Sequence, residues 1–87
     1  MSLKMFCIYD EKASAYNSPF YQKTTGMALR AIEDELKNND SQLSRHSSDF
    51  TLYEIGVWDE DKGVVNLYDT KKNLGVLTEF KKQVDNI

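Results

Sequence analysis

Cysteine, histidine and proline are scarce in this chain, because each occurs once among its 87 residues. With Cys7 alone, the chain can form neither a disulfide nor a cysteine-rich metal site of its own, which favours a reducing compartment. The single histidine, His46, has no cysteine beside it, so its spacing supports neither a nucleophile–base pair nor a metal cluster. We therefore expect no enzyme, no catalytic residue, no cofactor and no metal site, and we expect His46 to lie in a solvated loop.

Long hydrophobic runs are missing as well. No apolar stretch approaches the ~18 residues of a membrane span, and the start of the chain lacks the basic and then apolar layout of a signal peptide. These absences predict a single domain over residues 1–87 that does not enter a membrane and stays in the cytoplasm. Within this domain we interpret residues 1–4 as a vector-derived leader and residues 81–87 as a frayed tail.

Positive charge is also in short supply. Eleven basic against fourteen acidic residues give a net charge of -3, which opposes binding of nucleic acid by the electrostatics of the whole molecule. The lysines are unevenly placed, however. The tail contains Lys71, Lys72, Lys81 and Lys82, so the sequence is still compatible with a local positive surface. The acidic run 59–61 lacks the ligand spacing of a calcium loop, and we interpret it as a polar turn.

Hydrophobic residues make up 40% of the chain, enough for one core of modest stability in a protein of this size. Residues 4–9 are apolar on both faces, which is typical of a central strand. Residues 50–58 alternate aromatic and β-branched residues and give the strongest strand signal, with Gly56 marking a bulge or a close contact. A polar turn over 59–63 and a return strand over 64–68 would complete an antiparallel hairpin.

Helical periodicity appears between these strands. Thr24 or Thr25 can cap a helix that runs to about residue 37, with an apolar stripe of Leu29, Ile32 and Leu36. Residues 20–23 suit a short strand, and 41–49 a loop with one helical turn. The tail from residue 74 onward fits a C-terminal helix, although a glycine at 75 weakens its first turn. The element order predicts an α+β fold: a small antiparallel sheet of about four strands with one main helix packed on a face.

An ordered series of short motifs extends from Met5 to about Phe80. The motifs are Phe6-Cys7-Ile8-Tyr9-Asp10-Glu11-Lys12-Ala13, Tyr16, Pro19-Phe20, Gly26-Met27-Ala28, Arg30-Ala31, Asp49-Phe50-Thr51-Leu52-Tyr53-Glu54-Ile55-Gly56, Asp59, Gly63, Leu74-Gly75 and Glu79-Phe80. In this pattern the chain resembles the small non-structural protein of the gokushovirus branch of the microviruses, phages with small circular single-stranded DNA genomes. Ser47 and Lys71 depart from the pattern, because prolines are expected at both positions.

The resemblance implies a function that composition and periodicity do not show. Members of that family are described as DNA-binding proteins that help to switch the phage from replicating its genome to packaging single strands. For this chain the resemblance implies a non-structural protein of a bacteriophage, located in the host bacterial cytoplasm, with single-stranded DNA as its partner. It implies no catalytic residues.

Proteins that hold single strands without sequence preference stack bases on exposed aromatic rings and follow the phosphates with lysine and arginine. Tyr16 lies in a polar stretch and is the best aromatic candidate, whereas Phe20 and Tyr21 are more readily explained as core and surface residues of a strand. The lysines are more readily explained as solvated surface charges. The candidate DNA-binding residues are Lys12, Tyr16, Phe20, Tyr21, Lys23, Arg30, Lys71 and Lys72.

A protein-interaction module is the alternative that the acidic balance favours. Such a module would dock on the replication initiator or on the procapsid of the phage without binding DNA directly. Exposed sheet edges or an apolar face of the tail would then meet the partner. A homodimer is compatible with both hypotheses, because pairing would bury surface that a chain this short leaves exposed.

Overall fold

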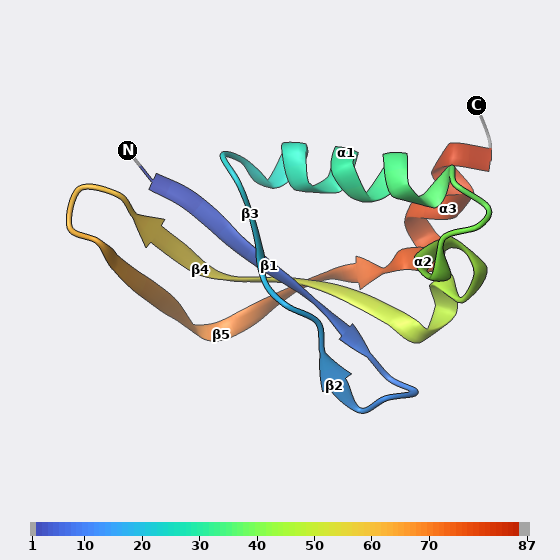
Figure 1. The fold of residues 1–87 in the computed structure, drawn as a ribbon, viewed down its shortest axis with the longest axis horizontal. Helices are drawn as coiled ribbons and strands as arrows, with labels where there is room; N and C mark the ends of the chain where they lie inside the picture. Colours follow the sequence, from blue (N-terminus) through green and yellow to red (C-terminus); the bar gives the residue numbers. More distant parts are fainter. Residues whose placement is uncertain (1, 86–87) are drawn as a thin grey trace.

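A computed structural model describes the backbone of residues 2–85 and the side chains of residues 2–81. It contains one five-stranded sheet with the helices gathered on one side (Figure 1). The elements are β1 (Ser2–Asp10), β2 (Ala15–Tyr16), β3 (Phe20–Gln22), α1 (Thr25–Leu36), α2 (Gln42–Arg45), the 3-10 helix η1 (Ser47–Asp49), β4 (Phe50–Asp59), β5 (Val64–Val76) and α3 (Leu77–Asp85). None of these helices is long and apolar enough to cross a membrane.

All strand pairs are antiparallel, and the order across the sheet is β2-β1-β4-β5. The short strand β3 also pairs with β1, on the edge that β2 occupies further along. The predicted α+β class is therefore confirmed. The strand β2 was not predicted, because two residues are too few to show an alternating pattern. It forms since Tyr16 and Ala15 pair with Tyr9 and Asp10 across a tight turn.

The core lies between the sheet and the helices. Phe6 of β1 and Leu52 of β4 are fully buried beneath α1 and α3, and so is Leu77 at the start of α3. The helix α1 contributes residues spaced four apart, as a single helix face requires. The buried cluster consists of Phe6, Ile8, Ala28, Ile32, Leu36, Phe50, Leu52, Leu77 and Phe80.

The start of α1 agrees with the sequence analysis. Thr24 is extended and its Oγ1 accepts a hydrogen bond of 3.1 Å from the backbone N–H of Met27, so Thr24 is the N-cap and Thr25 the first helical residue. The predicted apolar stripe faces the core: Ile32 and Leu36 are buried together with the neighbouring Ala28, and Leu29 is partly buried against the core.

Gly56 lies at an irregularity where the register between β4 and β5 shifts. A Cβ at this position would be 2.6 Å from the backbone oxygen of Asn66 and 3.0 Å from the Cα of Leu67. Both predicted reasons for a glycine, a bulge and a close contact, are therefore confirmed. The two halves of the hairpin can approach only because this residue has no side chain.

The end of the chain differs from the prediction. The strand β5 continues to Val76 instead of ending at residue 68, and α3 begins at Leu77 rather than at Leu74. Gly75 has a φ of 133°, which is not helical, and it lies in β5, where it pairs with Leu52 just before the helix. Of the residues interpreted as a leader, 2–4 pair with β4 as part of β1. Of the interpreted tail, residues 86–87 and the side chains of 82–85 lie outside the described part.

Candidate nucleic-acid interface

The face of the sheet opposite the described helices, which we call the open face, carries four of the five tyrosines and the single tryptophan. Residues paired across antiparallel strands point to the same side of a sheet, so the register identifies the members of this face. They are Leu3, Met5, Cys7, Tyr9, Tyr16, Tyr21, Thr51, Tyr53, Gly56, Trp58, Val65, Leu67, Asn73 and Val76. None of these paired positions carries a carboxylate, although the chain as a whole is acidic; exposed Asp69, two residues before Lys71 on β5, lies between the paired segments.

Three tyrosines from three strands form a cluster on the open face. The ring centroids of Tyr9 and Tyr16 are 4.8 Å apart, and those of Tyr16 and Tyr53 are 6.1 Å apart in an edge-on arrangement. The Nζ of Lys71, from β5, lies 5.4 Å from the centroid of Tyr16, within the range of a cation–π contact. Tyr16 is nevertheless half exposed, at 50%. We call these four residues the tyrosine cluster.

Cys7 lies in the same part of the open face but is only 4% exposed. Burial raises the pKa of its thiol, and the positive charge of Lys71 lowers it in part. The thiol is therefore a small buried group beneath the cluster rather than a reactive one.

The other two predicted aromatic residues, Phe20 and Tyr21, lie on opposite sides of the sheet. Phe20 stacks on Phe6 with ring centroids 5.5 Å apart and is partly buried against the core, which favours its interpretation as a core residue over one in base stacking. The core interpretation of Phe20 holds because β3 turns this residue toward the helices. Tyr21, the next residue along the strand, is 41% exposed on the open face.

The predicted basic residues are not brought together. Lys71 alone joins the tyrosine cluster, whereas Lys72 points to the opposite face, 3.8 Å from the carboxylate of Glu54. Arg30 is exposed on α1, in the helix layer, and Lys23 is exposed between β3 and α1. Neighbouring residues of a strand face opposite sides, which is why the Lys71-Lys72 pair is divided.

The other two lysines of the tail are Lys81 and Lys82. Lys81 donates a hydrogen bond of 2.9 Å to the backbone oxygen of Ser44 and so ties α3 to α2. The side chain of Lys82 lies outside the described part of the chain.

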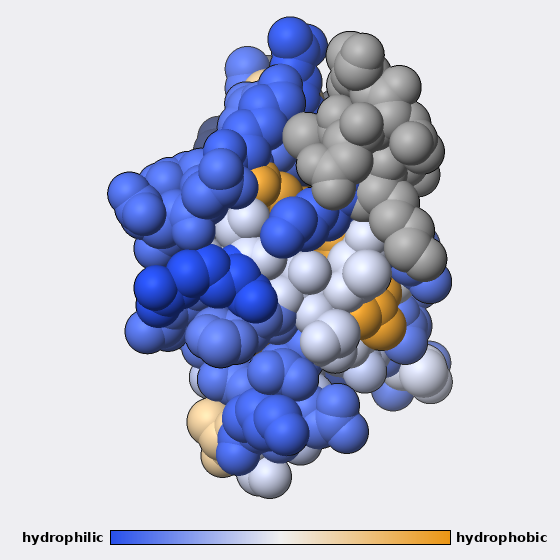
Figure 2. All heavy atoms as spheres, turned by 90° about the vertical axis from the view of Figure 1, so that its right-hand side faces the viewer, coloured by the Kyte–Doolittle hydropathy of each residue, from blue (hydrophilic) through white to orange (hydrophobic). Residues whose placement is uncertain are grey.

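Lys12 lines a separate open hollow of about 350 Å³, between the end of β1 and α2. The hollow combines Asp10, Asp49 and exposed His46 with Lys12. Figure 2 faces this end of the molecule, where hydrophilic residues predominate around a paler area with small hydrophobic patches. Among the described residues no group of histidine, cysteine or carboxylate side chains could hold a metal ion.

The acidic run 59–61 forms a turn, as predicted. The Oδ1 of Asp59 accepts hydrogen bonds from the backbone N–H groups of Asp61, at 3.0 Å, and Lys62, at 3.2 Å. This side-chain to backbone bonding is what aspartate supplies in tight turns.

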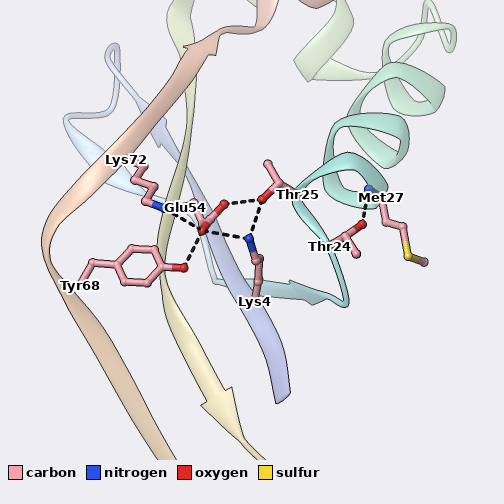
Figure 3. A network of polar contacts seen from close by, with 7 residues as sticks. All are labelled: Lys4, Thr24, Thr25, Met27, Glu54, Tyr68 and Lys72. Atoms are coloured by element: carbon pink, nitrogen blue, oxygen red, sulfur yellow. Dashed lines mark hydrogen bonds and ion pairs between the residues drawn. The ribbon is translucent and has the colours of Figure 1, made fainter. Parts of the chain in front are cut away.

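A buried carboxylate organises the helix side of the sheet (Figure 3). Glu54 is 2% exposed and accepts hydrogen bonds from Thr25 Oγ1 at 2.6 Å and Tyr68 Oη at 2.5 Å. Lys4 and Lys72 lie 3.7 and 3.8 Å from its Oε2 atom. Burial alone would raise the pKa of Glu54. The two hydroxyl donors and the two lysines together lower it by more than burial raises it, so the pKa of Glu54 is below its ordinary value. The network holds the start of α1 and strand β5 to the centre of the sheet.

The same network predicts an unusual tyrosine titration. The hydrogen bond to Glu54, helped by burial and by the negative charge of that carboxylate, raises the pKa of Tyr68 from 10.0 to about 12. Because the folded-state pKa is raised, Tyr68 stabilises the fold fully below pH 10, and this contribution is lost as the pH rises through about 12. In a spectroscopic tyrosinate titration, the chain should therefore show one tyrosine ionising near pH 12.

The variant Tyr68→Phe should lack that late ionisation, whereas the control Tyr21→Phe should keep it. A wild-type titration that is complete before pH 12 would contradict the assigned role of Glu54.

Sequence reasoning missed Tyr9, Tyr53 and Trp58 as members of the open face. They were assigned to strands without regard to which side the helices cover. One signal was present for Tyr53, because residues 51, 53 and 55 alternate with the buried residues 50, 52 and 54 of β4. Trp58 has the same parity as that buried set and faces the other side because the register shifts between Glu54 and Gly56. An aromatic residue on the non-core parity of a strand is a candidate for an exposed ring.

Comparison with family models adds the ancestry of the chain. Residues 3–80 match the family described as Phage ORF5 protein. The chain belongs to this family. The match confirms the prediction of a bacteriophage protein, and it covers β1 from its second residue, the other four strands of this chain and the start of α3.

Searches of curated proteins and of solved structures found no match to this Phage ORF5 family member.

Proposed function

We propose that this Phage ORF5 family member binds single-stranded DNA on the open face of its sheet, as a non-enzymatic protein of a gokushovirus-type microvirus. In this proposal it acts in the cytoplasm of the bacterial host and assists the switch from genome replication to packaging. The family match supports the phage setting. The DNA-binding role is supported by the composition and geometry of the open face.

The tyrosine cluster is the observation that carries the proposal. Single-stranded nucleic acid is held by aromatic rings that stack on bases and by cations beside them. Tyr16 offers a half-exposed ring, Tyr9 and Tyr53 support it from the neighbouring strands, and Lys71 places a cation 5.4 Å from its centroid. A base stacked on Tyr16 would thus have a phosphate partner within reach.

The distribution of charge supports the same face. A net charge of -3 would repel DNA from the molecule as a whole. The paired positions of the open face carry no carboxylate. Glu54 and Asp59 pair with Phe6 and Ser2 of β1, so their side chains lie on the helix side of the sheet. A strand lying on the open face would therefore avoid the acidic side chains of these two positions.

Fluorescence polarisation of a labelled single-stranded oligonucleotide, measured at several salt concentrations, tests the proposal. We expect binding that weakens as salt rises. Tyr16→Ala should lower the affinity by roughly 5- to 150-fold, the equivalent of about 1–3 kcal/mol for one stacked base. Lys71→Ala should reduce the slope of log K against log salt by about 0.7, the share of one phosphate contact with a single strand.

Two variants serve as controls. Tyr16→Phe keeps the ring and should keep most of the affinity. Lys37→Ala removes the same charge from the end of α1, in the helix layer, and should leave the salt slope unchanged. The proposal fails if micromolar protein shows no binding at low salt, or if Lys37→Ala weakens binding as much as Lys71→Ala does.

A second candidate is docking on a phage replication or procapsid protein, with or without a homodimer. The specific observation in its favour is Leu67, which is 67% exposed on β5, next to Val64 and Val65 at 42% each. Apolar side chains on an exposed strand are suited to pairing with another chain. Retention of one molecular mass at all concentrations in light scattering, together with salt-sensitive DNA binding, would favour the first candidate over this one.

A further inference from the structure

A second aromatic site lies on the open face, at the end of the sheet where β1 begins and the β4–β5 hairpin closes (Figure 1, left). It is an open pocket of about 300 Å³ lined by Leu3, Tyr21, Trp58 and Val65. Pairing in the sheet brings these residues together, since Leu3 is opposite Trp58 and Trp58 is opposite Val65. None of the four lining side chains is charged, and two are aromatic.

We propose that this pocket holds one nucleobase of the single strand that the tyrosine cluster binds. The inference rests on the proposed function and adds a second contact to it. The volume is at the lower end for small-molecule pockets, which suits a single planar ring better than a larger ligand. The rings of Tyr21 and Trp58 supply the aromatic faces on which any base can stack, so the pocket would tolerate different bases.

The distance between the two sites fits one continuous ligand. Leu3 and Tyr9 lie on the same face of β1, six residues apart, which corresponds to about 20 Å of strand. The positions between them on this face, Met5 and Cys7, are uncharged. An extended oligonucleotide could therefore run from the tyrosine cluster to the pocket, whereas a very short one could occupy only one site.

A second copy of the chain is the less favoured occupant. A stable dimer buries about 800 Å² on each partner. The pocket supplies only four side chains, of which Leu3 and Trp58 are partly buried and Tyr21 and Val65 are exposed, and these make up only a fraction of that area. A single base needs only the pocket itself, whereas a second copy of the chain would need a larger complementary surface around it.

Trp58 makes the test direct, because it is the only tryptophan in the chain. Oligothymidines of about 4 and about 16 nucleotides are titrated into the protein while tryptophan emission and the polarisation of a labelled oligonucleotide are followed together. We expect the longer oligonucleotide to quench Trp58 with the same midpoint as the polarisation change. Tyr21→Ala should weaken the longer oligonucleotide by roughly 5- to 150-fold and bring it near the affinity of the shorter one.

Tyr21→Phe keeps the ring and should retain the tighter binding, which separates stacking from a loss of folding. If polarisation reports binding while Trp58 emission stays unchanged, the pocket proposal is wrong and the proposed function stands. If neither signal changes, both are wrong. Emission that shifts with protein concentration before DNA is added would mean that a second copy covers the pocket, which also overturns the inference.

Discussion

Replacement of Glu54 by alanine is expected to lower the free energy of unfolding by roughly 2–4 kcal/mol, the largest effect predicted for this chain. Removal of the carboxylate leaves the hydroxyls of Thr25 and Tyr68 without their acceptor, although Thr25 Oγ1 still accepts from Lys4 Nζ at 3.2 Å. A buried donor without an acceptor costs about 1–3 kcal/mol. The total stability of a domain is only about 5–15 kcal/mol. Thermal unfolding should show the change as a lower Tm, by about 4–8 °C per kcal/mol.

The two lysines contribute little to this estimate. The side chains of Lys4 and Lys72 are 39% and 61% exposed, so water and salt screen their attraction to Glu54 and solvate them once it is gone. The hydrogen bonds inside the sheet–helix junction therefore account for most of the effect. High salt should reduce the difference in free energy of unfolding between wild type and Glu54→Ala only slightly.

Glu54→Gln and Glu60→Gln complete the series. The amide retains the shape and one acceptor oxygen, so Glu54→Gln should lose less stability than Glu54→Ala. Glu60 is exposed in the β4–β5 turn, and its replacement should leave Tm unchanged. Because the folded-state pKa of Glu54 is lowered, its stabilisation is lost as the pH falls through that value, below 4.5. The difference in free energy of unfolding between wild type and Glu54→Gln should therefore disappear at low pH. A difference that does not change with pH would contradict an ionised Glu54.

Gly56→Ala is expected to be the second most damaging substitution, with a loss of about 1–3 kcal/mol, as for overpacked sites. The added Cβ would meet the backbone oxygen of Asn66 at 2.6 Å and the Cα of Leu67 at 3.0 Å. Backbone atoms cannot rotate away as a flexible side chain can, so β4 and β5 would have to separate locally. Chemical denaturation should show a lower midpoint.

The same substitution at Gly26 is a matched control with the opposite expectation. A Cβ at Gly26 meets no atom nearer than Thr24 Oγ1 at 3.9 Å, and the residue lies in the first turn of α1. Gly26→Ala should leave stability unchanged or raise it by up to about 1 kcal/mol, because alanine favours the helix. Equal losses of stability for Gly26→Ala and Gly56→Ala would show that the close backbone contact at Gly56 is not what makes its substitution destabilising.

Local patterns were sufficient for most of the fold. The alternation over 50–58 predicted β4, and the capping threonine with its apolar stripe predicted α1, since both signals depend only on neighbours along the chain. The prediction failed where an element is set by its partners. The strand β2 exists only because β1 lies beside it. Gly75 was predicted to lie in the first turn of the C-terminal helix, although it pairs with Leu52 in β5 with a φ of 133°.

The candidate site was predicted less completely than the fold. Tyr16 and Lys71 were both selected from the sequence, and the structure brings them together. Phe20 and Lys72 were selected on the same grounds and are turned toward the helix side. Residue type alone cannot separate these pairs, because the side that a strand residue faces depends on which face the helices cover.

The sequence by itself determined the phage resemblance, the α+β class, the main helix and the β4–β5 hairpin, because each is recorded in the order and spacing of nearby residues. Only the tertiary structure decided that Tyr9, Tyr16 and Tyr53 meet under Lys71, and that Trp58 and Tyr21 share a pocket. These residues are brought together by strand register, which depends on pairing between segments distant along the chain. A shift of one residue in that register would turn the rings toward the core.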